Sequence, residues 1–211
     1  FAASKVRQFV QVDFSATPYN DIGSGKNKRK LYFPHIIVDF DLKTAMRLGL
    51  VKALVLDRRK EIGALPLEFK AERDESGNPQ LSEGQRVMLR AGLAKLRKLE
   101  HDFAQIDAAR HPKMLVVCED TTVSPLVAQF LCGEGLADDE VMAIDSGKKA
   151  ELKPDEWAVV RERLFDVDKH AKPRVIVSVL MLREGFDVSN ICVIVPLRSS
   201  QAQILLEQTI G

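Results

Sequence analysis

The stretch MLVVCEDTTVSPLVAQFLCGEGLADDEVMAI, residues 114–144, decides the fold. It opens with a continuous apolar run, residues 114–118, which is typical of a buried strand. Residues 124–132 predict a helix with a proline in its first turn, where the missing backbone N–H costs little. Residues 141–144 predict a second strand. A strand, a helix and a strand in this order indicate two parallel strands of one sheet.

The same alternation continues toward the C-terminus. The sequence predicts a helix over 154–165, strands over 175–179 and 191–195, and the start of a helix over 202–208. Short apolar strands that alternate with helices are typical of an α/β fold, in which helices cover both faces of a parallel sheet. Ligands of such sheets bind at the loops beyond the carboxyl ends of the strands. These loops are residues 119–123, 145–148, 180–187 and 196–200.

A long amphipathic helix is predicted before this sheet. Its apolar residues recur at steps of three and four: Leu89, Leu93, Leu96, Leu99, Phe103 and Ile106. Ser82 is a suitable N-cap, and the pattern runs to about Ala109, with Pro112 beyond its end. The polar face carries Arg86, Arg90, Lys95, Arg97 and Lys98. These side chains form a solvated face or, as a sharper hypothesis, a phosphate-contacting one. We expect an exposed loop over 72–84 and a helical insert over about 72–112.

The N-terminal part contains shorter segments. Residues 9–14, FVQVDF, alternate between apolar and polar side chains and predict a strand. Residues 20–30, NDIGSGKNKRK, are polar, basic and rich in glycine, and they predict a loop or linker. Three short segments follow: a strand over 36–40, a helix over 42–50 and a strand over 53–56.

Composition excludes several classes of protein. The chain has 211 residues, of which 45% are hydrophobic and 29% charged, as in ordinary soluble domains. Apolar runs such as residues 175–182 are too short to cross a bilayer, and residues 1–5 do not resemble a signal peptide. We therefore expect a cytoplasmic protein with no membrane partner. Three cysteines and four histidines show no metal-ligand spacing, so no metal site is expected.

Charge is unevenly distributed along the chain, although the net charge is only +1. Residues 1–113 hold 21 Lys and Arg against 14 Asp and Glu, a net charge of +7. Residues 114–211 hold 10 against 16, a net charge of −6. A basic half is compatible with a polyanionic partner, but surface charge also serves ordinary solvation, so this feature alone leaves both interpretations open.

The segment GSGKN, residues 23–27, superficially resembles a phosphate-binding loop. The full pattern needs a glycine five residues before the Gly-Lys pair and a Ser or Thr after it. Asn20 and Asn27 occupy those positions, and no helix pattern follows. We therefore interpret the segment as part of a basic linker.

Three further segments are each unremarkable alone. Ser15, Ala16 and Thr17 directly follow the predicted strand over 9–14, where hydroxyl residues commonly form turns. Residues 183–188, REGFDV, place a glycine and a carboxylate between two apolar strands, which a simple turn also explains. Residues 207–211, EQTIG, are compatible with an ordinary surface.

Taken in order, these segments resemble the helicase-like motor of type III restriction enzymes, the restriction subunit, within helicase superfamily two. Residues 15–17 resemble motif III, 38–52 the stretch after it, 114–121 motif IV, 176–188 motif V, and 196–198 with 207–211 the approach to motif VI and its first half. The resemblance implies the tail of a first RecA-like lobe over 1–20 and a basic linker over 21–34. It implies a second RecA-like lobe, of the P-loop NTPase fold, over 35–211.

The resemblance also implies roles for single residues. It assigns nucleotide contacts to Gly185, Asp187, Gln208 and Gly211, coupling to Ser15, Ala16 and Thr17, and DNA contacts to Thr121, Thr122 and Ser178. In the intact subunit the cofactors would be ATP and Mg²⁺. The partners would be DNA and a modification (methyltransferase) subunit.

This sequence departs from the family's pattern in ways that bear on activity. The family's phosphate loop and Asp-Glu motif would lie before Phe1 and its motif VI arginines after Gly211, and Phe186 stands where the family usually has tryptophan. No nuclease motif is visible. We expect an internal fragment that is inactive alone and completes no catalytic set. Two alternatives remain open: another superfamily-two helicase of the DNA-repair type, or a non-catalytic nucleic-acid-binding α/β domain.

Overall fold

A computed structural model describes residues 19–23, 27, 29–38, 40–53, 55, 70–144, 158, 162, 164, 165, 167–179 and 190–197. The predicted strand over 9–14, the predicted helix over 202–208 and the loops 145–148 and 180–187 lie outside these residues. The chain divides after Leu54 into two compact units, and each is described by itself.

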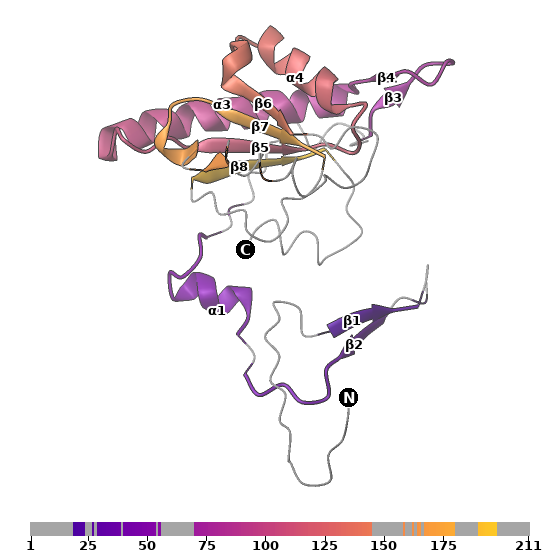
Figure 1. Cartoon of the computed structure of the whole chain (residues 1–211), viewed down its shortest axis with the longest axis vertical. Helices are drawn as coiled ribbons and strands as arrows, with labels where there is room; N and C mark the ends of the chain where they lie inside the picture. The colour runs from indigo at the N-terminus through magenta and orange to yellow at the C-terminus, as the bar shows by residue number, and fades with distance from the viewer. Residues whose placement is uncertain are drawn as a thin grey trace. The chain divides into compact units, whose positions relative to one another are not determined.

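The second unit is built on a parallel sheet of four strands. They are β5 (Lys113–Val117), β6 (Val141–Ile144), β7 (Val175–Ser178) and β8 (Ile191–Pro196). Their order across the sheet is β6-β7-β5-β8, and every pairing is parallel (Figure 1). The four strands predicted between residues 114 and 195 are therefore confirmed, as is the α/β class with a parallel sheet. The sheet is compatible with a RecA-like fold.

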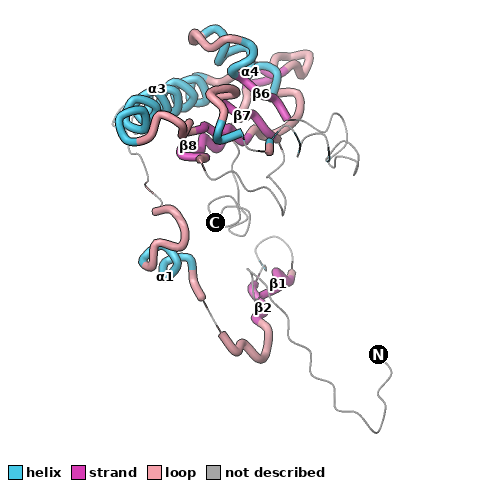
Figure 2. Tube along the Cα trace, turned by 60° about the vertical axis from the view of Figure 1, so that its left-hand side comes forward, coloured by secondary structure: helices cyan, strands magenta, loops and turns pink. Residues whose placement is uncertain are grey.

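Alternate side chains of the strands form two apolar clusters, one on each face. The larger cluster joins Met114, Val116, Val175 and Val177 to helices α3 (Glu83–Ile106) and α4 (Ser124–Gly133), which lie on the same side of the strands (Figures 1 and 2). The smaller cluster joins Leu115, Val117, Met142, Ile144 and Ile176 to Leu164. Leu164 is one of three described helical residues within the predicted helix over 154–165. Both faces of the sheet are thus covered by apolar packing.

Helix α3 begins where the sequence predicts. The Ser82 hydroxyl accepts the Gln85 N–H, and the Gln85 side chain accepts the Ser82 N–H, so the helix opens with a capping box. Leu89, Leu93 and Leu96 are at most 2% exposed and face the sheet. The expected insert over 72–112 is therefore a wrong description, because α3 supplies one of the layers of the core. The apolar stripe of a helix must be buried against another element, and here that element is the sheet.

Gly92 marks the closest approach of α3 to the sheet. A Cβ atom built on Gly92 would lie 2.5 Å from a Val195 methyl carbon and 2.9 Å from the Met114 sulfur. Glycine therefore allows the helix backbone to contact β5 and β8 directly.

A small hairpin precedes α3, where the sequence predicts an exposed loop. Its strands β3 (Glu72–Arg73) and β4 (Pro79–Gln80) pair antiparallel. The Asp74 carboxylate accepts the N–H groups of Ser76 and Asn78 at 2.9 and 2.8 Å, and Gly77 has φ +81°. The turn is therefore held by an aspartate and a glycine, as turn chemistry favours. Two short 3₁₀ helices, η2 (Asp138–Glu140) and η3 (Val167–Lys169), lie elsewhere in the unit.

The first unit contains a hairpin and a short helix. Strand β1 (Tyr19–Ile22) pairs antiparallel with β2 (Arg29–Tyr32). Helix α1 (Leu42–Arg47) begins after Asp41, whose carboxylate accepts the Thr44 N–H at 2.7 Å. The chain leaves α1 through Gly49, which has φ +71°. The predicted helix over 42–50 is therefore confirmed, with an end three residues earlier.

Several predictions for the first unit are wrong. The predicted linker over 20–30, and with it the basic linker over 21–34, contains most of the β1–β2 hairpin. The described residues of 36–40 form no strand, and Ile37 and Val38 are 83% and 78% exposed. Val55, in the predicted strand over 53–56, is likewise exposed and belongs to no strand. An apolar run becomes a strand only when it pairs with a neighbour, and the sequence pattern does not supply one. The division after Leu54 also places residues 35–54 outside the second unit, where they were predicted.

Candidate functional site

The carboxyl edge of the sheet has the topology of a binding site. Strands β5 and β7 are neighbours, but β6, which follows β5, lies on one side of the pair and β8, which follows β7, on the other. The connections therefore leave the two strands in opposite directions along the sheet. Open α/β sheets bind ligands beyond the carboxyl ends of strands at such a switch point. The described residues that border it are the loop after β5, residues 118–123, and the ends of β7 and β8.

Asp120 organises the loop after β5. Its Oδ1 accepts the Thr122 N–H at 2.8 Å, the Thr122 hydroxyl at 2.6 Å and the Val123 N–H at 3.1 Å. Its Oδ2 pairs with an Arg73 guanidinium nitrogen at 2.8 Å. Burial acts to raise the pKa of Asp120, but the hydrogen bonds from Thr122 and Val123 and the Arg73 charge outweigh it. The pKa therefore lies below its ordinary value of 3.8, and the carboxylate is ionised at neutral pH.

The structure brings the three predicted DNA-contacting residues to this edge, but it exposes only two of them. Thr122 is exposed and Thr121 half-buried in the loop after β5. Ser178 ends β7 and is 1% exposed. It points to the opposite face from Val177, into the sheet's packed interior, because side chains alternate along a strand. Ser178 is therefore too deeply buried in this structure to contact DNA directly.

Cys118, at the start of the same loop, is not a nucleophile. It is fully buried, and burial, with the charges of Asp120 and Glu119 behind it, raises the pKa of its thiol to about 12. A thiol with that pKa carries almost no thiolate at neutral pH. Cys118 instead packs in the larger apolar cluster of the core.

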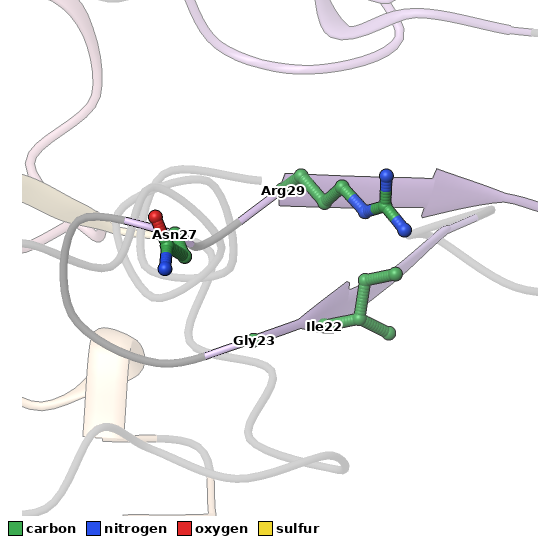
Figure 3. A pocket seen from close by; sticks show the side chains of 4 residues that line it. All are labelled: Ile22, Gly23, Asn27 and Arg29. Carbon is green, nitrogen blue, oxygen red and sulfur yellow. The ribbon is translucent and has the colours of Figure 1, made fainter.

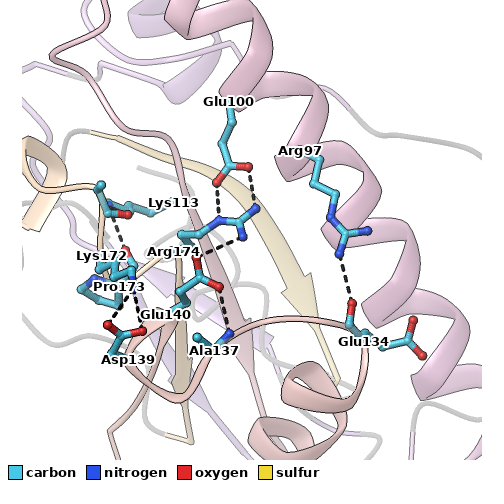
Figure 4. Close-up of polar contacts among 11 residues, drawn as sticks. Arg97, Glu100, Lys113, Glu134, Ala137, Asp139, Glu140, Lys172, Pro173 and Arg174 are labelled. Atoms are coloured by element: carbon cyan, nitrogen blue, oxygen red, sulfur yellow. Dashed lines mark hydrogen bonds and ion pairs between the residues drawn. The ribbon is translucent and has the colours of Figure 1, made fainter.

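The amino edge of the same sheet holds a cluster of charged side chains that sequence analysis missed. Arg174 pairs through two nitrogens with both Glu100 oxygens at 2.7 Å, and a third nitrogen lies 3.4 Å from Glu140 (Figure 4). Nearby, Lys172 pairs with Asp139 at 2.7 Å. The Ala137 N–H, followed by the Arg174 charge, holds the pKa of Glu140 below its ordinary range. These pairs join α3, η2 and the start of β7.

Lys113 is the most deeply buried charged residue of the amino edge. Its side chain is fully buried, and its ammonium donates to the carbonyl oxygens of His170 and Pro173, the latter at 2.8 Å (Figure 4). An ammonium that satisfies backbone carbonyls fixes the chain before β7. The sequence places Lys113 beside an apolar run, which gives no sign that it is buried.

A hollow of about 300 Å³ lies at this amino edge, bordered by Glu100, His111, Glu140 and Arg174 among others. The Arg174 guanidinium, which borders the hollow, already pairs with the carboxylates of Glu100 and Glu140. The hollow therefore offers little to an anionic ligand. It also lies away from the edge where ligands of parallel sheets bind.

Two of the basic side chains on α3 contact α4 and its C-terminal turn. Arg90 pairs with Glu134 at 2.9 Å and lies 5.3 Å from the centre of the Phe130 ring. Arg97 donates to the Glu134 carbonyl at 3.1 Å (Figure 4). Of the two interpretations of this helix face, these contacts favour a structural role over phosphate contact for Arg90 and Arg97.

The glycine-rich segment 23–27 joins the two strands of the β1–β2 hairpin. Gly23 has φ +89°, and the open hollow at this end of the hairpin is lined by Ile22, Gly23, Asn27 and Arg29 (Figure 3). Strand β2 follows the segment, whereas a phosphate-binding loop leads into a helix N-terminus. The interpretation of this segment as a false match is therefore supported, although a strand does precede it.

The remaining predicted site residues lie outside the described residues. They are Ser15, Ala16, Thr17, Gly185, Asp187, Gln208 and Gly211. Their assignment rests on the sequence. Within the described residues, no group of three or more His, Cys, Asp or Glu side chains could hold a metal ion. In that same part of the chain no helix is both long and apolar enough to span a bilayer.

Comparisons of the chain with family models, with curated proteins and with solved structures find no match.

Proposed function

We propose that this chain is part of the ATP-dependent DNA-translocating motor of a type III restriction enzyme, and that its second unit is most of the second RecA-like lobe. The observation that carries the proposal is the adjacency of β5 and β7. The segments that resemble motifs IV and V begin in these two strands and leave the sheet at one carboxyl edge. Two motifs that act on one bound strand of DNA and one nucleotide must lie within reach of each other.

In this proposal the loop after β5 contacts the DNA backbone. The Thr121 hydroxyl can donate to a phosphate oxygen, whereas the Thr122 hydroxyl already donates its one proton to Asp120 Oδ1 and so holds the loop. The loop also precedes the N-terminus of α4, which favours phosphate groups. Such contacts position a duplex without reading its sequence. Ser178 is left out because it is buried.

The nucleotide side of the proposal rests on residues 183–188 and 207–211. Gly185, Asp187, Gln208 and Gly211 would line the cleft that holds ATP and Mg²⁺, and Ser15, Ala16 and Thr17 would couple that cleft to DNA. ATP hydrolysis in the intact subunit would supply the free energy for movement along DNA before cleavage. A modification subunit would be the protein partner.

A DNA-binding titration of the 211-residue chain tests the proposed interface. Fluorescence anisotropy with several unrelated duplexes should give similar dissociation constants that weaken steeply with salt. Replacing Thr121 and Thr122 together with valine should weaken binding about five- to tenfold, because the Thr121 contact, worth about 1 kcal/mol, is lost together with the Thr122 bond that holds the loop. Thr44→Val is the matched control, since its hydroxyl also bonds a capping aspartate, Asp41, in the other unit.

Two results would contradict the proposal. Strong discrimination between duplex sequences would favour a non-catalytic binding domain instead. Equal affinities of the double variant and the Thr44→Val control would remove the loop after β5 from the interface.

A further inference from the structure

The β3–β4 hairpin is tied to the loop after β5 by two contacts that span long stretches of sequence. The Ala71 N–H donates to Glu119 Oε1 at 2.9 Å, and an Arg73 guanidinium nitrogen lies 2.8 Å from Asp120 Oδ2. A second Arg73 nitrogen donates to the Gly77 carbonyl at 3.3 Å, which fixes the arginine on its own hairpin. The hairpin therefore holds two consecutive carboxylates of the loop.

Asp120 divides its two oxygens between these neighbours. Oδ2 is held by Arg73, and Oδ1 accepts three hydrogen bonds from Thr122 and Val123. Rotation of the carboxylate would move both oxygens together. The guanidinium on one side thus determines how the loop is held on the other.

We propose that Arg73 is a positioning residue for DNA: through Asp120, and the Thr122 hydroxyl that bonds it, Arg73 fixes the loop after β5 in the conformation that presents Thr121 to the phosphate backbone. The inference rests on the proposed function of that loop. The Arg73 and Asp120 side chains are 45% and 40% exposed, so their ion pair adds little to the stability of the whole domain. Its effect is local, on the part of the loop that lies between the buried residues Cys118 and Val123.

Simple electrostatics and the positioning role of Arg73 predict opposite effects of Asp120→Asn on DNA affinity. Asp120→Asn removes a negative charge beside the proposed DNA site, so simple electrostatics predicts tighter binding. Positioning predicts weaker binding, because the neutral amide no longer holds the Arg73 guanidinium. Arg73→Gln should weaken binding by about three- to tenfold, and Arg73→Lys should restore part of the loss, since lysine keeps a charge that reaches Asp120 but not the planar fork.

The matched control is Arg110→Gln. Arg110 is 68% exposed and pairs with Asp107 at 3.3 Å after the end of α3, so its removal takes away the same charge from a comparable surface pair. It should weaken DNA binding less than Arg73→Gln at the same salt concentration. Amide hydrogen exchange of Thr122 and Val123, measured without DNA, should accelerate in Arg73→Gln and in Asp120→Asn but not in the control.

The outcomes separate this inference from the proposed function. Unchanged exchange at Thr122 and Val123 in Arg73→Gln, or tighter DNA binding by Asp120→Asn, would overturn the positioning role whatever the loop does. Faster exchange, together with DNA binding that responds neither to these variants nor to the threonine double variant, would contradict the proposed interface, and with it the role of Arg73 toward DNA.

Discussion

The two edges of one parallel sheet are built from different chemistry. At the amino edge, long charged side chains from α3, η2 and the start of β7 pair with one another, and a buried lysine satisfies backbone carbonyls. At the carboxyl edge, one aspartate holds a short loop that carries two threonines. Charged groups that pair within the protein contribute to the fold, whereas a short, constrained loop at a switch point is suited to binding a ligand.

The largest effect is expected from Asp187, in the segment that follows β7 in the sequence. Under the proposed function, Asp187→Asn should lower ATP turnover of the intact subunit on the order of a hundredfold or more, because it would remove a preorganised charge from the proposed nucleotide cleft. Steady-state ATPase assays measure this, and a thermal melt confirms folding. Turnover within about threefold of the wild type would assign Asp187 to a turn, a role that asparagine fills almost as well.

The next largest effect is a loss of stability, and it is expected at the amino edge. Lys113→Met should lower the free energy of unfolding by about 2–4 kcal/mol, because the carbonyls of His170 and Pro173 lose a buried donor. Chemical denaturation measures the change. Lys98→Met, at an exposed position on α3, is the control and should change stability by less than about 0.5 kcal/mol. If the two variants were equally stable, the amino edge would not have the stabilising role described here.

A smaller loss of stability is expected where α3 packs on the sheet, between its two edges. Gly92→Ala should lower stability by about 1–3 kcal/mol, because its methyl group meets Val195 and Met114. Gly133→Ala, near the end of α4, meets nothing within 4 Å and should be neutral or stabilising. Denaturation curves of the pair would contradict this packing if Gly92→Ala were the more stable variant.

The smallest effect is a dependence on pH at the carboxyl edge. The pKa of Asp120 is lower in the folded state than its ordinary value of 3.8, so its contribution is present above that value and lost as pH falls through the lowered pKa. Asp120→Asn should therefore be slightly less stable than the wild type at pH 7, by less than about 1 kcal/mol. The difference should shrink as pH falls below 3.8. Denaturation at a series of pH values measures this stability difference. A difference that grows as the pH falls would contradict the prediction.

Local patterns predicted much of the second unit. The Ser82–Gln85 pair opens α3, Pro125 lies in the first turn of α4, and four apolar runs become β5 to β8. These features depend on neighbours within a few residues. The order β6-β7-β5-β8 was not predicted, because pairing between strands depends on residues far apart in the chain.

The wrong and missing predictions also concern contacts between residues far apart in the chain. Residues 36–40 have the composition of a strand, but the described apolar side chains among them are exposed, since a run of apolar residues does not specify a partner. Arg73 and Asp120 are 47 residues apart, and neither carries a motif that points to the other. Lys113 directly precedes the strand predicted over 114–118, where a lysine is ordinarily solvated. Only the folded chain reveals that the carbonyls of His170, Ala171 and Pro173 receive its ammonium.

The proposed function assigns DNA binding to the carboxyl edge of the sheet and not to the amino edge. Amide chemical shifts of the isotopically labelled 211-residue chain, recorded during titration with a DNA duplex, test this assignment most directly. Saturable shifts are expected around the loop after β5, from Glu119 to Val123, and none around Asp139, Lys172 and Arg174. Shifts confined to the amino edge, or no saturable shift at low salt, would contradict it.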